Sequence, residues 1–158
     1  MSGQQGAVKL VEVQHEHLEI FFRNQLDTEA NDLAKVYPRK RDEFDAHWAR
    51  IMNNPEVVAR SIQFGDGVAG NINAFWIESE MYVGYWIDKA HWGKGIATNA
   101  LAELISLVEV RPLFARVAIE NIGSVCVLER CGFVKADEFD SAGDDRFVAC
   151  VEAVYILE

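Results

Sequence analysis

The sequence predicts an α+β (mixed α/β) domain, in which a mostly antiparallel, twisted sheet of about seven strands carries helices on both faces. Three observations lead to this fold class. The 158 residues fit one domain at about 150 residues per domain. Half of them are apolar, which excludes a disordered chain. Strand-like segments gather in the middle of the chain and then alternate with helix-like segments, with no repeat or linker between them.

The N-terminal third contains one predicted strand and three predicted helices. Residues 8–13 alternate in polarity and are rich in valine, which is typical of a strand. Apolar residues then recur at helical spacing over 16–26, and the short oxygen-bearing side chains of Asp27 and Thr28 are suited to capping a second helix. A third helix is predicted over 42–52.

The middle of the chain predicts three antiparallel strands, over residues 57–64, 68–75 and 81–87. The Gly65-Asp66-Gly67 turn between the first two is a hairpin signal, because glycine adopts the positive φ that tight turns require. After residue 87 helices and strands alternate. The predicted elements are a long helix over 95–110, a strand over 113–119, a short helix over 122–131, and strands over 133–139 and 147–157 around a loop at 140–146.

The charge balance limits the classes of partner. Lysine and arginine number 15 against 25 aspartates and glutamates, a formal net charge of -10. We therefore expect no nucleic-acid binding, since such proteins present a basic surface. An acidic surface instead suits cationic partners. The segment expected to attract a basic protein tail contains Asp137, Glu138, Asp140, Asp144 and Asp145.

The sequence also favours a cytoplasmic protein with no membrane contact. There is no run of about 18 apolar residues, and the first six residues are small and polar, unlike a targeting signal. The odd number of cysteines, Cys126, Cys131 and Cys150, lacks metal spacing and predicts core thiols in a reducing compartment. His15 and His17 do not share a helix face, so no metal site is expected.

The segment from Tyr85 to Thr98 carries the strongest chemical signal, because it runs from a strand through a glycine turn into the long helix. Backbone N–H groups at a helix start are unpaired, and the helix dipole favours negative charge there. Gly93 and Gly95 remove the side chains that would keep an anion away from these amides, and Ala97 keeps the next position small. The turn is therefore predicted to bind a phosphate or pyrophosphate.

Three alternatives apply to this turn. The Walker pattern GxxxxGK[ST] is absent. The dinucleotide pattern GxGxxG lacks its third glycine, because Thr98 stands there, and it usually opens a domain, whereas antiparallel strands come first here. The third alternative is a tight turn that binds nothing.

Two blocks of sequence resemble the GNAT superfamily of acetyl-CoA-dependent N-acetyltransferases. The family's pyrophosphate loop follows [Q/R]-x-x-G-x-[G/A], which the segment from Trp92 to Ala97 matches at Gly95 and Ala97, with Trp92 at the first position. A second block, Asn121-Ile-Gly-Ser124 followed by a Gly-Phe pair, is similar to the family's N-x-x-[S/A] … GF segment. The resemblance is closest to the RimJ/RimL-like branch. It covers nearly the whole chain, so residues 1–158 are expected to form a single acetyltransferase domain.

The resemblance implies a GNAT-like fold, acetyl-CoA as co-substrate, and direct attack of a primary amine on the thioester. A backbone amide at the opened end of the fourth strand would donate to the thioester carbonyl. Because glycine inside a strand often marks a bulge, we expect one at Gly84. The residues implied to contact acetyl-CoA are Trp86, Ile87, Asp88, Trp92, Gly93, Lys94, Gly95, Ile96, Ala97, Thr98, Asn121 and Ser124.

The usual proton donor of the family is a tyrosine, but that position is Leu128 in this sequence. In RimJ/RimL-like members an earlier serine serves the thiolate, and it maps to Ser124, with Asn121 contacting the cofactor or ordered water. The alternative for Ser124 is a helix N-cap beside Asn121, and the two roles are compatible. The missing tyrosine also keeps a second function open, a catalytically inactive acetyl-CoA-binding sensor or interaction module.

No strong general base is evident. Glu80 is the catalytic carboxylate candidate and Glu120 is the other one available, although a solvated acid explains each. His47 and His91 are interpreted as surface or helix-end residues. Near pH 7.4 an α-amino group of pKa ~7.8 costs about 0.5 kcal/mol to neutralise, against about 4 kcal/mol for lysine.

The missing base therefore favours a low-pKa amine. The resemblance implies the same class, namely a ribosomal or other protein N-terminus, or a small amine. A monomer or homodimer is expected. The aromatic residues expected to wall the acceptor slot are Phe21, Tyr37, Trp76 and Tyr82.

Overall fold

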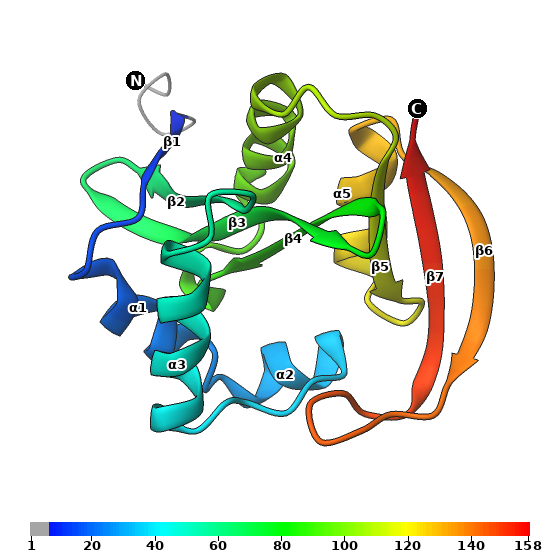
Figure 1. Cartoon of the computed structure of the whole chain (residues 1–158), viewed down its shortest axis with the longest axis horizontal. Coiled ribbons are helices and arrows are strands. Elements are labelled where there is room, and N and C mark those ends of the chain that lie inside the picture. The colour runs from blue at the N-terminus through cyan, green and yellow to red at the C-terminus, as the bar shows by residue number, and fades with distance from the viewer. Residues whose placement is uncertain (1–6) are drawn as a thin grey trace.

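The computed structural model describes residues 7–158, and in this range one seven-stranded sheet is accompanied by five α-helices (Figure 1). The strands are β1 (Val8–Glu12), β2 (Val58–Phe64), β3 (Gly67–Ile77), β4 (Glu80–Ile87), β5 (Leu113–Ala118), β6 (Val134–Ser141) and β7 (Cys150–Leu157). The helices are α1 (His17–Asn24), α2 (Thr28–Ala34), α3 (Arg41–Met52), α4 (Ile96–Leu107) and α5 (Ile122–Arg130), with a short 3-10 helix η2 (Lys89–His91).

The sheet has the order β1-β2-β3-β4-β5-β7-β6. Every neighbouring pair is antiparallel except β4 and β5, which are parallel and pair only at Met81–Leu113 and Tyr82–Phe114. Beyond these two pairs the strands diverge, and Figure 1 shows β1–β4 and β5–β7 turning away from each other at this junction. The predicted α+β class and mostly antiparallel sheet are confirmed.

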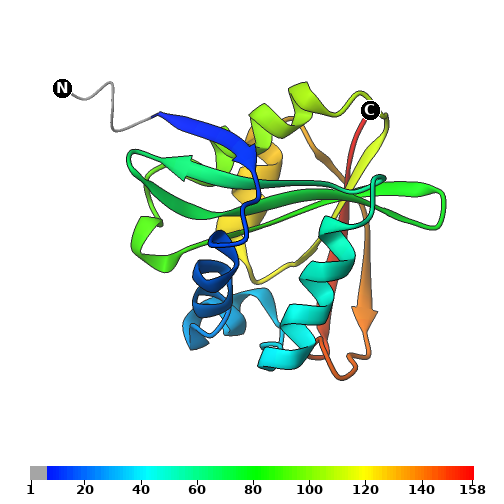
Figure 2. The same ribbon diagram turned by 60° about the vertical axis from the view of Figure 1, so that its left-hand side comes forward.

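Helices cover both faces of the sheet, as the sequence predicts. In Figures 1 and 2, α4 lies on one side of strands β2–β4, and α1 and α3 lie on the other. The α4 side chains at helical spacing, Ile96, Ala100, Leu101 and Leu104, are almost fully buried in the main core, as is Leu128 of α5. On the opposite face Phe21, Phe44 and Trp48 form a separate aromatic cluster between α1 and α3.

The expected bulge at Gly84 is wrong. The β3–β4 register runs without interruption from Gly70–Ile87 to Ile77–Glu80. A register shift occurs instead in the β2–β3 pair, between Ile62 and Gln63. The sheet opens because β5 diverges from β4, and β4 itself stays regular.

Several segment ends also differ from the sequence prediction. The strand predicted over 133–139 continues to Ser141 and so takes in the start of the expected loop at 140–146, and the first helix is shorter than predicted, His17–Asn24 instead of 16–26. The long helix ends at Leu107, because Val108 has extended backbone angles (φ -98°, ψ 120°). The last strand begins at Cys150 rather than at residue 147, since Phe147 makes only an isolated bridge to Val36. That bridge joins the α2–α3 connection to the loop before β7.

No helix within residues 7–158 is long and apolar enough to cross a membrane. The sequence expectation for a targeting signal concerns residues 1–6, which lie outside the described residues.

Candidate functional site

A cavity of about 560 Å³ lies where β4 ends and α4 begins, and we call it the turn cavity. Its volume is in the range of small-molecule sites. The wall combines residues of α2, the end of β4, the glycine turn, and the first turns of α4 and α5. The predicted site residues among its lining are Trp86, Ile87, Trp92, Gly93, Gly95, Ile96, Ala97, Thr98, Asn121 and Ser124.

The glycine turn leaves the start of α4 bare. Gly93 and Gly95 have φ of +80° and +76°, the left-handed region that favours glycine. Gly95 is the N-cap of α4, and within residues 7–158 no side-chain hydrogen bond caps the helix start. The two glycines of this turn line the turn cavity, and the absence of a side-chain cap among the described residues leaves its amides available to a phosphate group.

The side chains of Trp92 and Lys94 make contacts within the protein instead of pointing to a phosphate role. The Trp92 indole donates to the carbonyl of Ile87 at 3.0 Å and so ties the turn back to β4. The Lys94 ammonium lies 5.8 Å from the centroid of the Phe64 ring, and Lys94 is absent from the turn-cavity lining. Asp88 is also outside it: its carboxylate caps η2 and its amide donates to Ala69.

A second cavity, of about 650 Å³, lies on the α1–α3 side of the sheet, and we call it the strand cavity. Strands β3, β4 and β5, helix α3 and the loop before β7 contribute to its wall. Both cavities are lined by Ala34, Tyr85, Trp86, Asn121 and Ser124, so the two spaces meet at these residues.

Tyr85 and Ser124 form a hydroxyl pair at this meeting point. Their hydroxyl oxygens are 2.7 Å apart. Burial raises the pKa of Tyr85 to about 12, against the lowering effect of the Ser124 hydrogen bond, so the phenol stays protonated at physiological pH. Asn121 is the N-cap of α5, because its side chain accepts from the Ser124 amide at 3.4 Å. The hydroxyl of Ser124 is thus directed to Tyr85 and not to capping.

Sequence reasoning missed Tyr85. Leu128, which stands where the family usually has tyrosine, is buried in the main core and offers no hydroxyl. A signal was present, since Tyr85 lies at the end of the strand that leads into the glycine turn. Its pairing with Ser124 joins positions 39 residues apart, which no local pattern shows.

The two carboxylate candidates, Glu80 and Glu120, lie in different places and have different partners. Glu80 lies at the exposed start of β4, accepts from the Tyr82 hydroxyl at 3.3 Å, and lines neither cavity. The structure therefore does not bring Glu80 together with Ser124 and Asn121. Glu120 lines the turn cavity but forms an ion pair with Lys35 at 3.0 Å.

His47 lines the strand cavity as a neutral imidazole. Burial, followed by the charges of Arg39, Arg50 and Arg146, lowers the pKa of His47 to about 4. Such a weak base does not deprotonate an ammonium group near neutral pH. His91 lines the turn cavity, with its Nδ1 3.5 Å from an Asp88 carboxylate oxygen.

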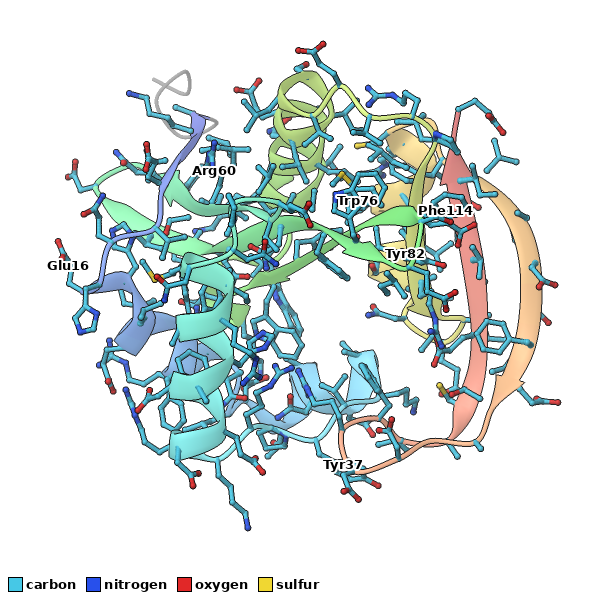
Figure 3. The ribbon with its side chains drawn as sticks, in the orientation of Figure 1. Glu16, Tyr37, Arg60, Trp76, Tyr82 and Phe114 are labelled. Atoms are coloured by element: carbon cyan, nitrogen blue, oxygen red, sulfur yellow. The ribbon has the colours of Figure 1, made fainter. Side chains whose placement is uncertain are left out.

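The remaining site expectations hold only in part. Phe21 and Tyr82 line the strand cavity, whereas Tyr37 and Trp76 are exposed and do not. Figure 3 shows Tyr82 and Phe114 at the β4–β5 junction and Tyr37 near the loop before β7, and the Tyr82 and Phe114 rings are 5.4 Å apart. The expectation of core thiols is wrong for Cys126, which is exposed on α5 and lines the turn cavity.

The fold matches solved acetyltransferases. The microcin C7 self-immunity acetyltransferase MccE, solved with acetyl-CoA and AMP, is 20% identical, with 94% of this chain and 91% of that one covered at a TM-score of 0.78. The spermidine N-acetyltransferase of Vibrio cholerae, solved with CoA and spermine, is 17% identical with 95% of each chain covered and a TM-score of 0.79. The ribosomal alpha-N-protein acetyltransferase RimL, solved with coenzyme A, is 18% identical, covers 95% and 94%, and has a TM-score of 0.74.

This fold and its glycine turn define an acetyltransferase-type domain. Residues 8–134 match the family model described as the acetyltransferase (GNAT) domain, and the chain belongs to that family. The probable N-acetyltransferase YjcK of Bacillus subtilis (strain 168) is 40% identical over 58 residues, which is 34% of this chain and 32% of that protein. The match thus spans about a third of this curated relative's length. Since RimL, MccE and the spermidine enzyme have comparable TM-scores, the RimJ/RimL-like branch is not singled out.

Proposed function

We propose that this chain transfers an acetyl group from acetyl-CoA to a primary amine of low pKa, either a protein or peptide N-terminus or a small amine. Membership of the GNAT family supports the reaction class. Three similar structures hold acetyl-CoA or CoA, which supports acetyl-CoA as the co-substrate.

One observation carries the proposal: the two cavities share lining residues, and Ser124 is among them. The turn cavity begins at the bare amides of Gly95 to Thr98 and ends at the Tyr85–Ser124 pair. The strand cavity reaches the same pair from the other side of the sheet. A pyrophosphate held at the turn and an amine in the strand cavity would therefore meet at Ser124.

The opened edge of β4 supplies hydrogen-bond donors. Beyond Tyr82 no residue of β4 pairs with β5, so backbone groups from Val83 to Ile87 on that edge are free of strand pairing. Trp86 lines both cavities, and its indole donates to the carbonyl of Asn24 at 3.1 Å, which fixes the end of the strand. An amide here is placed to polarise a carbonyl oxygen, as the resemblance implies.

The hydroxyl pair handles the proton of the reaction. Acetyl-CoA supplies the activated acetyl thioester when bound. As the C–N bond forms and the C–S bond breaks, the Ser124 hydroxyl gives its proton to the departing sulfur. The proton lost by the amine nitrogen then replaces it, and the protonated Tyr85 phenol holds the Ser124 oxygen in position throughout.

The acceptor class follows from the missing base. The ion pair of Glu120 with Lys35 and the depressed pKa of His47 leave the junction without a carboxylate or imidazole suited to deprotonation. The amine must therefore arrive neutral, which costs about 0.5 kcal/mol for an α-amino group and about 4 kcal/mol for a lysine near pH 7.4.

The test is release of free thiol from acetyl-CoA in the presence of an amine panel. The panel contains ribosomal-protein N-terminal peptides, other peptides with free α-amines, polyamines and lysine side-chain peptides blocked at the N-terminus. We expect amine-dependent thiol release that is fastest with α-amines. Binding of acetyl-CoA by calorimetry without turnover on any amine would contradict the enzyme and support the sensor alternative.

A further inference from the structure

Two arginines in the wall of the strand cavity lack an acidic partner. Other charged side chains there are paired: Arg116 binds Glu152 at 3.0 Å, and Lys35 binds Glu120, which lies outside the cavity lining, at 3.0 Å. Arg39 and Arg146 also line the cavity, and among the described residues neither has a carboxylate oxygen within 4.0 Å of its guanidinium nitrogens.

The backbone around Arg146 explains why the nearest acid does not pair with it. The Asp144 carboxylate accepts from the backbone amides of Arg146 and Phe147, each at 2.8 Å, and so shapes the loop. One guanidinium nitrogen of Arg146 donates to the carbonyl of Tyr37, while its Nε is buried with no hydrogen-bond partner in the range 7–158. The side chain is thus anchored at one nitrogen and has an unused donor.

Arg39 is held in place through its backbone rather than its charge. Its amide donates to the Gln25 side chain at 2.8 Å, and the Gln25 amide donates back to the Arg39 carbonyl at 3.0 Å. Gln25 is itself buried. This two-way contact fixes the backbone at the position from which the Arg39 side chain lines the cavity, and it does not involve the guanidinium group.

The two charges are costly where they lie. Burial lowers the pKa of Arg146 to about 10, the neighbouring charge of Arg39 adds to the lowering, and the Asp144 carboxylate, which lines the same cavity, opposes it. The same arginines depress the pKa of His47. Because the chain has ten more acidic than basic residues, the missing pairing is not a shortage of carboxylates. Half-buried charges of one sign cost free energy unless a counter-charge joins them.

We infer that the amine acceptor carries an anionic group, a carboxylate or a phosphate, which Arg39 and Arg146 bind in the strand cavity while the amine faces Ser124. Arginine suits this role because its planar donors match the oxygens of both groups. This inference rests on the proposed function and narrows its substrate class. It concerns the cavity alone, and the expected attraction of a basic protein tail to the acidic residues between 137 and 145 stays a prediction.

The experiment compares acceptors that differ only in the charged group. Four peptide amides start with alanine, so their α-amines are alike, and carry glutamate, phosphoserine, glutamine or lysine at the second or third position. With saturating acetyl-CoA, we expect kcat/KM for the glutamate or phosphoserine peptides to exceed that for the glutamine peptide by about tenfold. The lysine peptide should have the lowest kcat/KM. A higher kcat/KM for the glutamate peptide indicates a carboxylate site, and a higher kcat/KM for the phosphoserine peptide indicates a phosphate site.

Variants of the two arginines test whether they cause the preference for anionic over neutral peptides. Arg39→Met and Arg146→Met should each bring the anionic-to-neutral ratio toward one, and Arg146→Lys should keep part of it. Arg23→Met is the matched control, because Arg23 is exposed on α1 and lines neither cavity, and it should keep the ratio. Arg39→Met tests the inference even if Arg146→Met perturbs the loop at Tyr37.

Two results overturn the inference. One is a glutamine or lysine peptide acetylated as fast as the anionic peptides, and the other is a preference that survives both methionine variants. If no peptide is acetylated, the same peptides are titrated calorimetrically into the CoA-saturated protein. Tighter binding of the anionic peptides then supports the inference while the lack of transfer contradicts the proposed function, and equal binding overturns the inference.

Discussion

The turn cavity and the strand cavity meet at Ser124 but are built by different means. The turn cavity depends on a backbone conformation, two glycines in the left-handed region before α4 with no side-chain cap. The strand cavity depends on side chains that arrive from β3, α3 and the loop before β7. A site made of backbone groups is determined by a few consecutive residues, whereas a site made of side chains depends on residues that the fold brings together from distant parts of the sequence.

The largest expected effect breaks the turn cavity. Gly95→Asp should abolish measurable acetyl-CoA binding, because a side chain at φ +76° is strained and a carboxylate would lie where phosphate is expected. Calorimetric titration measures it. Gly65→Asp is the control, since Gly65 has φ +62° in the β2–β3 turn and lines neither cavity. Unchanged affinity in Gly95→Asp would remove the turn from the site.

The next effect concerns the point where the cavities meet. Ser124→Ala should lower kcat by about 10²-fold, the size expected for general acid catalysis, and leave the Kd of acetyl-CoA nearly unchanged. Steady-state rates and calorimetry separate the two quantities. Ser106→Ala, on the exposed side of α4, serves as the control. A Ser124→Ala enzyme with the original kcat would limit Ser124 to a packing role.

A third variant tests whether β4 is held rigidly between the cavities. A Cβ added at Gly70 would lie 2.0 Å from the Trp86 carbonyl oxygen, so Gly70→Ala must displace β4 at the site. We expect a loss of about 1–3 kcal/mol in the free energy of unfolding, together with reduced activity. In contrast, a Cβ at Gly67 meets nothing within 4 Å, and Gly67→Ala should change neither. Urea unfolding compares the pair.

Removing the second hydroxyl sharpens the assignment at the junction. Tyr85→Phe should lower kcat about tenfold, less than Ser124→Ala, because the phenol orients the serine rather than giving its proton to sulfur. Since the pKa of Tyr85 is about 12, wild-type kcat should show no loss from tyrosine ionisation between pH 7 and 10. A tyrosine-dependent fall in that range would contradict the assigned protonation state.

The smallest effect is on stability at acid pH. The pKa of His47 is about 4 in the folded chain and about 6.5 when unfolded, so the unfolded state takes up the proton first as the pH falls. After discounting for solvent screening, the free energy of unfolding should fall by about 1 kcal/mol between pH 6.5 and 4 because of His47. Chemical unfolding of His47→Gln should show a smaller loss than wild type. His15 is exposed, so His15→Gln serves as the control, and its free energy of unfolding should fall by as much as that of wild type.

The contrast between the cavities also explains what the sequence predicted. The helix beginning near Ile96, the strands on either side of Gly65, and the turn at Gly95 follow from local periodicity and glycine placement, and all are present. Both the order β5-β7-β6 and the short β4–β5 pairing depend on contacts distant in sequence, so no pattern gave them.

The same limit applied to the site residues. Glu80 was favoured because it precedes β4, yet the length of the strand separates it from the junction. Tyr85 was missed because its partner lies 39 residues further on. Arg39 and Arg146 lie 107 residues apart in the sequence, and only the fold places both in one wall.

The brevity of the β4–β5 pairing has a kinetic consequence. Only two residue pairs join these strands, and two cavities lie beside them. Under the proposed function each cavity takes one substrate, so both substrates would be bound before any bond changes. Initial-rate plots at several fixed acceptor concentrations should then intersect, as expected for a sequential order with a ternary complex.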